Sequence, residues 1–249
     1  MFYGLSLENK VKFLQALKSI AETYPGGMYA QDMLICVGKN IAFRSDEKFM
    51  ASFDAHANSD QEKSLLWRLH VLAWAGLNAL HVEGDFVECG VLRGFSSAVL
   101  CQFLEFDKLS REFLLYDTFS GLPEETSTEA ERKNWDYTML DSDKLYQEVC
   151  QIFSPYSNVN IIKGIVPQSF ENTVPDKIAY LHIDMNSEAA EMMALDHLFD
   201  RVSPGGLIVL DDYGWISNVN QTIAESKFMQ EHQHAILELP TGQGLILKH

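Results

Sequence analysis

The sequence predicts an α/β fold in which a mostly parallel β-sheet carries helices on both faces. From residue 84 onward, short apolar segments alternate with amphipathic ones, as expected for strands and helices that wind around a parallel sheet. A glycine-containing turn joins the first of these strands to a helix. The last two strands are separated only by "TGQ", which indicates a hairpin and therefore one antiparallel strand.

Chain length and charge limit the classes of function. The 249 residues suffice for one large α/β domain with additions, and the formal net charge is −16. Such an acidic chain is poorly suited to bind nucleic acid or an anionic membrane surface. The N-terminal "MFYGLSLENK" lacks a signal-peptide pattern, and no apolar run reaches about 18 residues. We therefore expect a soluble, cytoplasmic protein.

Residues 1–83 are predicted to form an N-terminal helical extension, distinct from a ligand-binding domain at 84–249. A helix over 6–24 has an apolar face, and a helix over 59–80 begins with the capping-box pattern Ser59-x-x-Glu62. The segment between them is compatible with short helices or with loops. We expect this extension and the polar segment at 119–143 to act as a lid over the site or as the contact of a homodimer.

The domain that follows contains seven predicted strands and a long polar segment at 119–143. The strands are placed at 85–91, 112–119, 159–166, 178–185, 207–214, 234–240 and 244–249, with helices at 95–106, 144–156, 187–202 and 218–230. Ligands of open α/β sheets bind at the carboxyl ends of the strands. Four aspartates stand at such ends in this sequence: Asp117, Asp184, Asp211 and Asp212.

The turn after the first strand carries the pattern Glu88-x-Gly90-x-x-x-Gly94. Its glycines allow close approach to a ligand, and the helix that follows directs its first amides toward the same place. A dinucleotide-binding fingerprint has a glycine where this chain has Glu88. A carboxylate would repel pyrophosphate but attract an ammonium or sulfonium group, and S-adenosylmethionine carries both.

Further residues extend this predicted cofactor site. Ser96 offers a hydroxyl to the cofactor carboxylate, and Asp117 can accept both ribose hydroxyls from the end of the second strand. An alternative is a plain strand–turn–helix unit without a cofactor. The residues predicted to bind the cofactor are Glu88, Gly90, Val91, Gly94, Ser96, Asp117 and Gly164.

Three acids predict a metal site. Asp184 ends the fourth strand, while Asp211 and Asp212 end the fifth, and adjacent strands lie about 5 Å apart. Crowded carboxylates repel one another unless they are protonated or bind a cation. Oxygen ligands suit magnesium or another divalent cation. The alternative is that one aspartate caps a helix and another is solvated.

The turn "ECGVLRGFSSAVL" resembles the first motif of class I S-adenosylmethionine-dependent methyltransferases. Together with "YDTFSGLPE" and "LHIDM…SPGGLIVLDDYG", it is similar to the macrocin-type (TylF-like) sugar O-methyltransferases. The resemblance implies a Rossmann-like fold with strand order 3-2-1-4-5-7-6 and an antiparallel strand seven. It also implies magnesium on the acids of the two strand ends.

The function implied is metal-dependent transfer of a methyl group from S-adenosylmethionine to a hydroxyl of a small molecule, a sugar or glycosylated natural product. Asp184 and Asp211 would act through the metal. Catechol-type relatives carry a lysine base where this chain has Ser187, and macrocin-type enzymes usually carry "GD" where it has Met185-Asn186. The general base is therefore unassigned.

Two other functions were compared with this one. A nicotinamide-dependent oxidoreductase is disfavoured by Glu88, and a non-catalytic S-adenosylmethionine-binding module gives no reason to crowd three carboxylates. His182 is expected to be a packed strand histidine. Aromatic residues on nearby loops would either stack on an acceptor ring or pack a lid: Trp135, Tyr137, Tyr213 and Trp215.

Overall fold

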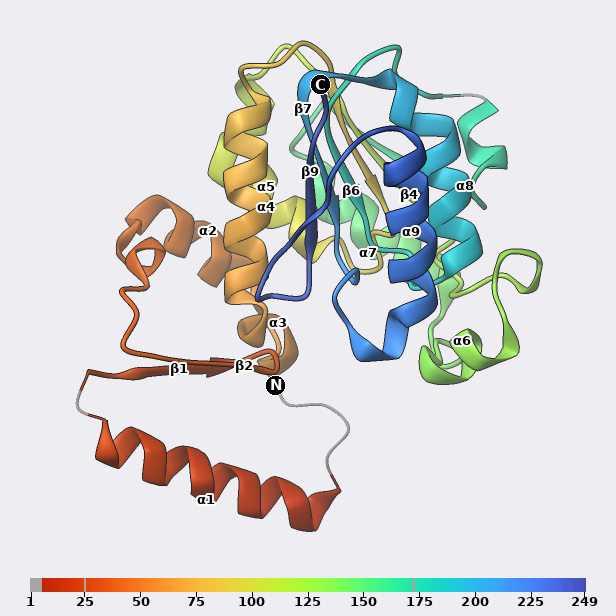
Figure 1. Ribbon diagram of the computed structural model, residues 1–249. Helices are drawn as coiled ribbons and strands as arrows, with labels where there is room; N and C mark the ends of the chain where they lie inside the picture. The colour runs from red at the N-terminus through yellow and green to blue at the C-terminus, as the bar shows by residue number, and fades with distance from the viewer. Residues whose placement is uncertain (1–5, 25, 172) are drawn as a thin grey trace.

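A seven-stranded sheet forms the centre of the protein, with strand order β5-β4-β3-β6-β7-β9-β8 (Figure 1). The computed structural model describes residues 6–24, 26–171 and 173–249. Counted along this sheet alone, the order is the predicted 3-2-1-4-5-7-6, and β9 is antiparallel to both neighbours. The strands are β3 (Asp85–Cys89), β4 (Phe113–Asp117), β5 (Val159–Lys163), β6 (Ile178–Ile183), β7 (Val202–Leu210), β8 (Leu237–Glu238) and β9 (Gly244–Leu247).

Helices cover both faces of the sheet (Figure 1). Helices α4 and α5 lie on one face, while α8 and α9 lie on the other. This double cover explains why the central parallel strands are apolar and buried on both sides, as β6 is along its whole length. The α-helices after the N-terminal segment are α4 (Leu66–Ala79), α5 (Phe95–Leu104), α6 (Glu129–Asn134), α7 (Ser142–Phe153), α8 (Glu188–Leu198) and α9 (Val219–Glu231).

Short 3-10 helices complete the connections, and no described helix is long and apolar enough to cross a membrane. The 3-10 helices are η1 (Ala42–Ser45), η2 (Phe106–Lys108), η3 (Glu124–Thr126), η4 (Gln168–Glu171), η5 (Phe199–Arg201) and η6 (Ile216–Asn218).

The N-terminal segment contains the predicted helix and an unpredicted hairpin. Helix α1 (Leu7–Thr23), capped by Ser6, matches the expected helix and is set apart from the sheet (Figure 1). Between 28 and 58 the chain forms an antiparallel hairpin and the helix α2: β1 (Met28–Gln31), β2 (Leu34–Val37) and α2 (Glu47–His56). The helix predicted over 59–80 is divided at Leu65 into α3 (Asp60–Ser64) and α4. The division at residue 84 stays a prediction, and α4 packs on β6, β7 and α5 in the same hydrophobic core.

Strand register brings two polar side chains together inside the sheet. Glu88 of β3 pairs with His182 of β6, so these residues are direct neighbours on one face. The same face carries the apolar side chains that pack against α4 and α5. The pair Glu88–His182 therefore lies at the edge of this core layer where β3 and β6 end.

The two glycines of the first turn are required by the protein itself. Gly90 has φ +91°, and a Cβ built on it would lie 1.8 Å from the carbonyl oxygen of Asp184. Gly94 has φ +73°, and its Cβ would lie 2.8 Å from the ring of Phe153. Both conformations favour glycine, and both sites lack space for a methyl group. Close approach of backbone and side chains, before any ligand is considered, explains these glycines.

We expect Gly90→Ala to lower the free energy of unfolding by about 3 kcal/mol or more, because it combines backbone strain with a backbone collision. Gly27→Ala is the matched control. Gly27 has φ +81° and no atom within 4 Å of its built Cβ, so only the strain of about 1–2 kcal/mol applies. Chemical denaturation of both variants measures the difference, and equal losses would refute the collision.

Candidate active site

A cavity of about 560 Å³ opens at the carboxyl ends of the strands. Of the residues proposed from sequence, Glu88 and Gly94 do not line it. Those that do line it are Gly90, Val91, Ser96, Asp117, Gly164, Asp184, Asp211 and Asp212. The structure thus brings the predicted cofactor turn and the predicted acid cluster to one cavity.

Asp117 closes the turn that follows β3. One carboxylate oxygen accepts hydrogen bonds from the amides of Val91 (2.7 Å) and Leu92 (2.8 Å), and the other accepts one from Phe119 (2.6 Å). Burial raises the pKa of Asp117, although these amide bonds act in the opposite direction. The end of β4 therefore fixes the glycine turn at the cavity wall.

Glu88 lies behind the wall, with 1% of its surface exposed. Its carboxylate accepts hydrogen bonds from the hydroxyls of Ser96 (2.9 Å) and Ser97, the two serines of the first turn of α5. The same group pairs with Nδ1 of His182 at 2.8 Å. Glu88 thus holds the helix start against β6, and its direct contact with a cofactor cation stays a prediction.

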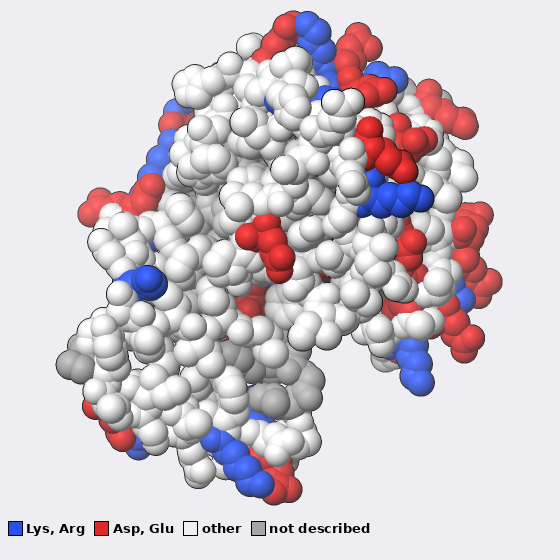
Figure 2. Space-filling view, viewed as in Figure 1, with Lys and Arg blue, Asp and Glu red and all other residues white. Residues whose placement is uncertain are grey.

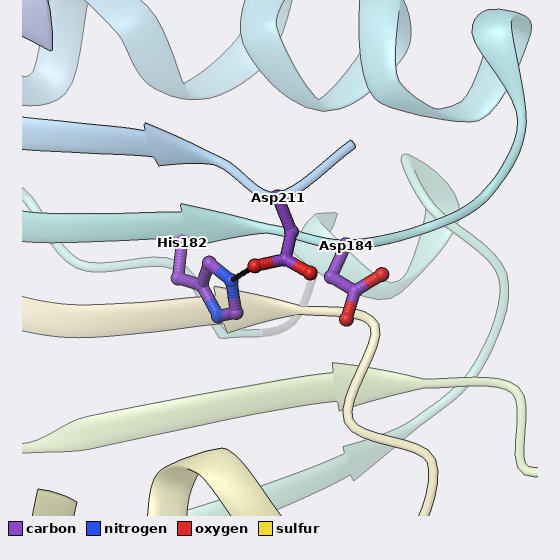
Figure 3. A group of neighbouring side chains, drawn as sticks. All are labelled: His182, Asp184 and Asp211. Carbon is purple, nitrogen blue, oxygen red and sulfur yellow. Dashed lines mark ion pairs between the residues drawn. The ribbon is translucent and has the colours of Figure 1, made fainter. Parts of the chain in front are cut away.

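His182, Asp184 and Asp211 form a cluster at the ends of β6 and β7 (Figure 3). One potential ligand atom from each residue lies within 4.8 Å of the others. Asp212 is outside this group in the described part of the chain. Its carboxylate instead accepts a hydrogen bond from Asn218 (3.2 Å).

Arg68 of α4 is the functional residue that sequence reasoning missed. Its guanidinium pairs with Asp211, with Asp212 (3.5 Å) and with Asp32 (2.7 Å). It also lies over the ring of Trp215, 4.8 Å from the centroid. Helical spacing places Arg68 on the same face as the apolar Leu65 and Leu72. A charged residue within an apolar face indicates a buried ion pair, and this pattern could have identified Arg68 from the sequence.

The three strand-end acids differ in electrostatic environment. Burial, together with the charges of Asp211 and Asp212, raises the pKa of Asp184 well above its usual range. Burial would also raise the pKa of Asp211, but Arg68 and His182 hold it below its usual value. Burial raises the pKa of Asp212 to about 7, with Arg68 opposing the shift. One arginine therefore leaves the negative charge of this cluster incompletely compensated.

His182 is buried, as expected, but it is more than a packing residue. It lies between Glu88 and Asp211, whose carboxylate is 3.5 Å from Nε2 (Figure 3). Burial would lower the pKa of His182, but pairing with these acids raises it to about 10. The ring is therefore an imidazolium at neutral pH and joins the cofactor turn to the acid cluster.

A buried glutamate accepts hydrogen bonds from the backbone of the loop that follows Asp184. Glu191 of α8 accepts hydrogen bonds from the amides of Met185 (3.0 Å) and Asn186 (3.1 Å). The side-chain amide of Asn186 donates to Asp184 at 3.3 Å. Position 186 thus supplies a neutral amide beside the first acid of the cluster.

Loop aromatics form the outer part of the cavity. Trp135 and Tyr137 of the polar segment and Trp215 after β7 line it, as expected for residues at the rim. Tyr213 does not line it, and its hydroxyl is 2.9 Å from that of Ser226. The segment 119–143 and the start of α4 together narrow the open edge of the sheet.

The sheet order and the cavity at the strand ends define a class I, Rossmann-like methyltransferase fold. Solved structures with this fold include the O-methyltransferase NovP (TM-score 0.64, 19% identity, 74% of this chain and 80% of NovP). The S-adenosylhomocysteine-bound Podospora anserina methyltransferase PaMTH1 aligns over the whole of both chains (TM-score 0.53, 11% identity). Identities this low show the fold alone.

The family model for macrocin O-methyltransferase (TylF) matches residues 66–239, and the chain belongs to this family. Mycinamicin III 3''-O-methyltransferase of Micromonospora griseorubida is 31% identical over 142 residues, 53% of this chain and 56% of that protein. A tetracenomycin-C 4'-O-methyltransferase of Streptomyces olivaceus, whose substrate carries a dimethoxyrhamnosyl group, is 28% identical over 53% of this chain and 54% of that protein. The match thus spans about half the length of these curated relatives.

We expect His182→Phe to lower the free energy of unfolding by about 3–5 kcal/mol, because Glu88 then remains buried without its cationic partner. The double variant Glu88→Gln/His182→Phe should lose less than the two single variants together. A double-mutant cycle in urea measures this coupling, and strictly additive losses would show that the two side chains do not stabilise each other.

Proposed function

We propose that the protein is an S-adenosylmethionine-dependent O-methyltransferase that acts on a hydroxyl of a sugar or of a glycosylated small molecule. The observation that carries the proposal is the single cavity into which both the glycine turn and the strand-end acids open. Methyl transfer needs donor and acceptor in near-attack geometry, and a shared cavity at one sheet edge provides this arrangement. Membership of the macrocin O-methyltransferase family supports the same chemistry.

The turn and the start of α5 fit the methyl donor. Gly90 and Val91 expose backbone to the cavity, and the first amides of α5 lack partners within the helix, which suits a carboxylate. Asp117 presents an acceptor to the ribose, and Gly164 lies beside it, its amide donating to the backbone of Asp117 at 2.9 Å. S-adenosylmethionine bound here would supply an electrophilic methyl group.

The acid cluster fits a divalent cation, which we propose as a second cofactor. Asp184 and Asp211 converge, and one guanidinium nitrogen of Arg68 pairs with both Asp211 and Asp212, so these three acids would hold magnesium or a similar ion. Burial raises the pKa of Asp184 most, and the neighbouring charges of Asp211 and Asp212 add to the shift, which supports a site that a cation would stabilise. A cation at this site would lower the pKa of an acceptor hydroxyl.

Charge and shape of the cavity favour an uncharged acceptor with a sugar ring. Trp135, Tyr137 and Trp215 offer faces on which a ring can stack. Acids outnumber bases among the described lining residues, which disfavours an anionic acceptor. The acids are Glu62, Asp117, Asp184, Asp211 and Asp212, and the bases are Arg68 and Arg93. One relative methylates a tetracenomycin that carries a dimethoxyrhamnosyl group, which agrees with this proposal.

Incubation with labelled S-adenosylmethionine, magnesium and a panel of glycosides and their aglycones tests the activity. We expect label in glycosides, loss of turnover in EDTA and its return with excess magnesium. Asp184→Asn and Asp211→Asn should reduce turnover by about 10³-fold or more while S-adenosylhomocysteine still binds. Full turnover in EDTA would refute the metal requirement, and label in no glycoside would refute the acceptor class.

Asp117→Asn should weaken S-adenosylhomocysteine by about 1.5–3 kcal/mol, because a charge-assisted bond to the ribose is lost. Both oxygens of Asp117 accept hydrogen bonds from turn amides and asparagine has only one oxygen, so the free energy of unfolding of the variant is measured beside its affinity for S-adenosylhomocysteine. Asp143→Asn, an exposed acid at the start of α7, is the control. Calorimetric titration gives the affinities, and an unchanged value would remove Asp117 from the ribose site.

We further propose that the N-terminal segment forms a homodimer contact. Val11 and Leu14 of α1 are 51% and 50% exposed, and Met33, Ile35 and Val37 of the hairpin are exposed as well. In the view of Figure 2, the part of the surface where α1 and the β1–β2 hairpin lie shows few charged side chains except along its lower edge. Leu14→Glu should convert a dimer to a monomer in light scattering, whereas a wild-type monomer would rule the contact out.

A further inference from the structure

Arg68 is shared by acids from two distant parts of the chain. Its Nε lies 2.7 Å from Asp32, in the turn of the β1–β2 hairpin, and its Nη1 pairs with Asp211 and Asp212 after β7. The guanidinium is largely buried, with 11% of the side chain exposed. The N-terminal hairpin therefore reaches the acid cluster through one arginine.

The hairpin turn is built in an unfavourable backbone conformation. Asp32 and Met33 have φ values of +48° and +60°, so both central residues of the turn are left-handed without being glycine. Asp32 is only 7% exposed, and its second carboxylate oxygen has no hydrogen-bond partner among the described residues. The turn thus places a carboxylate inside the protein, where Arg68 is its cationic partner.

We propose that Arg68 is a tethered counter-cation that competes with a divalent cation for Asp211, and that Asp32 is a positioning residue that limits this competition. The proposal rests on the metal requirement of the proposed function. It assigns the hairpin a role in setting the affinity of the cluster for metal.

The contacts of Asp211 account for the competition. One carboxylate oxygen pairs with Arg68, while the other accepts a hydrogen bond from Gln243 (2.8 Å) and lies 3.5 Å from His182. A cation that joins Asp184 to Asp211 must therefore share or displace one of these partners. Arg68 lies closer to Asp211 than the imidazolium of His182, which is 3.5 Å away, and is therefore the stronger competitor.

Arg68 and Asp32 then have opposite effects on the affinity of the cluster for a metal ion. Removing the charge of Arg68 makes the cluster more negative and frees an oxygen of Asp211, so a divalent cation binds more tightly. Removing the charge of Asp32 makes the cluster less negative. Arg68 then pairs only with Asp211 and Asp212 and neutralises them more fully, so the divalent cation binds more weakly. A role limited to folding would move both variants in the same direction.

Titration of Mn²⁺ into the S-adenosylhomocysteine-loaded protein, followed by electron paramagnetic resonance, tests the proposal. We expect Arg68→Met to bind Mn²⁺ at least about tenfold more tightly and Asp32→Asn about threefold or more weakly than the wild type. Arg68→Lys keeps the positive charge but loses the fork that reaches Asp32 and Asp211 together, so its affinity for Mn²⁺ should lie between those of the wild type and Arg68→Met. Arg44→Met, an exposed arginine of η1, is the matched control and should not change the affinity.

Equal Mn²⁺ affinity in the wild type and Arg68→Met would overturn the competition while leaving the metal requirement intact. Absence of binding in both would overturn the competition and the metal requirement together. Affinity for S-adenosylhomocysteine verifies that each variant is folded. If Arg68→Met fails to fold, the double variant Asp32→Asn/Arg68→Met, which removes both charges, replaces it. The double variant should bind Mn²⁺ more tightly than Asp32→Asn. Weaker binding by the double variant would overturn the proposal.

Discussion

A buried chain of alternating charges determines how the active-site elements fit together. It runs from Glu88 through His182, Asp211 and Arg68 to Asp32, and each interior member has a partner of opposite charge on both sides. Burying an unpaired charge costs several kcal/mol, so each member depends on its neighbours. The chain joins the cofactor turn, the ends of β6 and β7, helix α4 and the N-terminal hairpin. The N-terminal hairpin is thereby joined to the edge of the sheet, although Asp32 and Asp211 are far apart in sequence.

Strand periodicity explains why two adjacent acids have different environments. Successive residues at the end of β7 point to opposite faces of the sheet. Asp211 shares the face of Glu88 and His182, above the core packed by α4 and α5, whereas Asp212 turns toward Asn218 at the start of α9. Arg68 spans this edge and contacts both. The opposite pKa shifts of the two acids follow from this division, because the better-paired carboxylate stays ionised and the less well-paired one binds a proton more readily.

Much of the fold followed from local sequence patterns, and the strand order from resemblance to a known family. Apolar strands, capped helices and the terminal hairpin are local features, and the parallel topology places all strand-end acids on one edge. The hairpin at Met28–Val37 was not predicted, because its turn places Met33 after Asp32, where glycine is the usual residue. Arg68 and the pairing of Glu88 were also missed. Both depend on partners more than 90 residues away, and no local periodicity encodes such pairs.

The contact between Gly90 and the carbonyl of Asp184 also constrains motion. The glycine turn, which would hold the methyl donor, meets the acid cluster, which would hold the acceptor, at this point with no space for a methyl group. The amide of Asp184 also donates a hydrogen bond to β3, the strand that leads into the turn. Neither the turn nor the cluster can shift without the other. In the proposed reaction, entry and exit of ligands would therefore depend on the periphery of the cavity, which is formed by the segment 119–143 and the elements around α3 and α4. Acceptors of different shape would be accommodated by these outer segments, because the contact between Gly90 and Asp184 leaves no space for change.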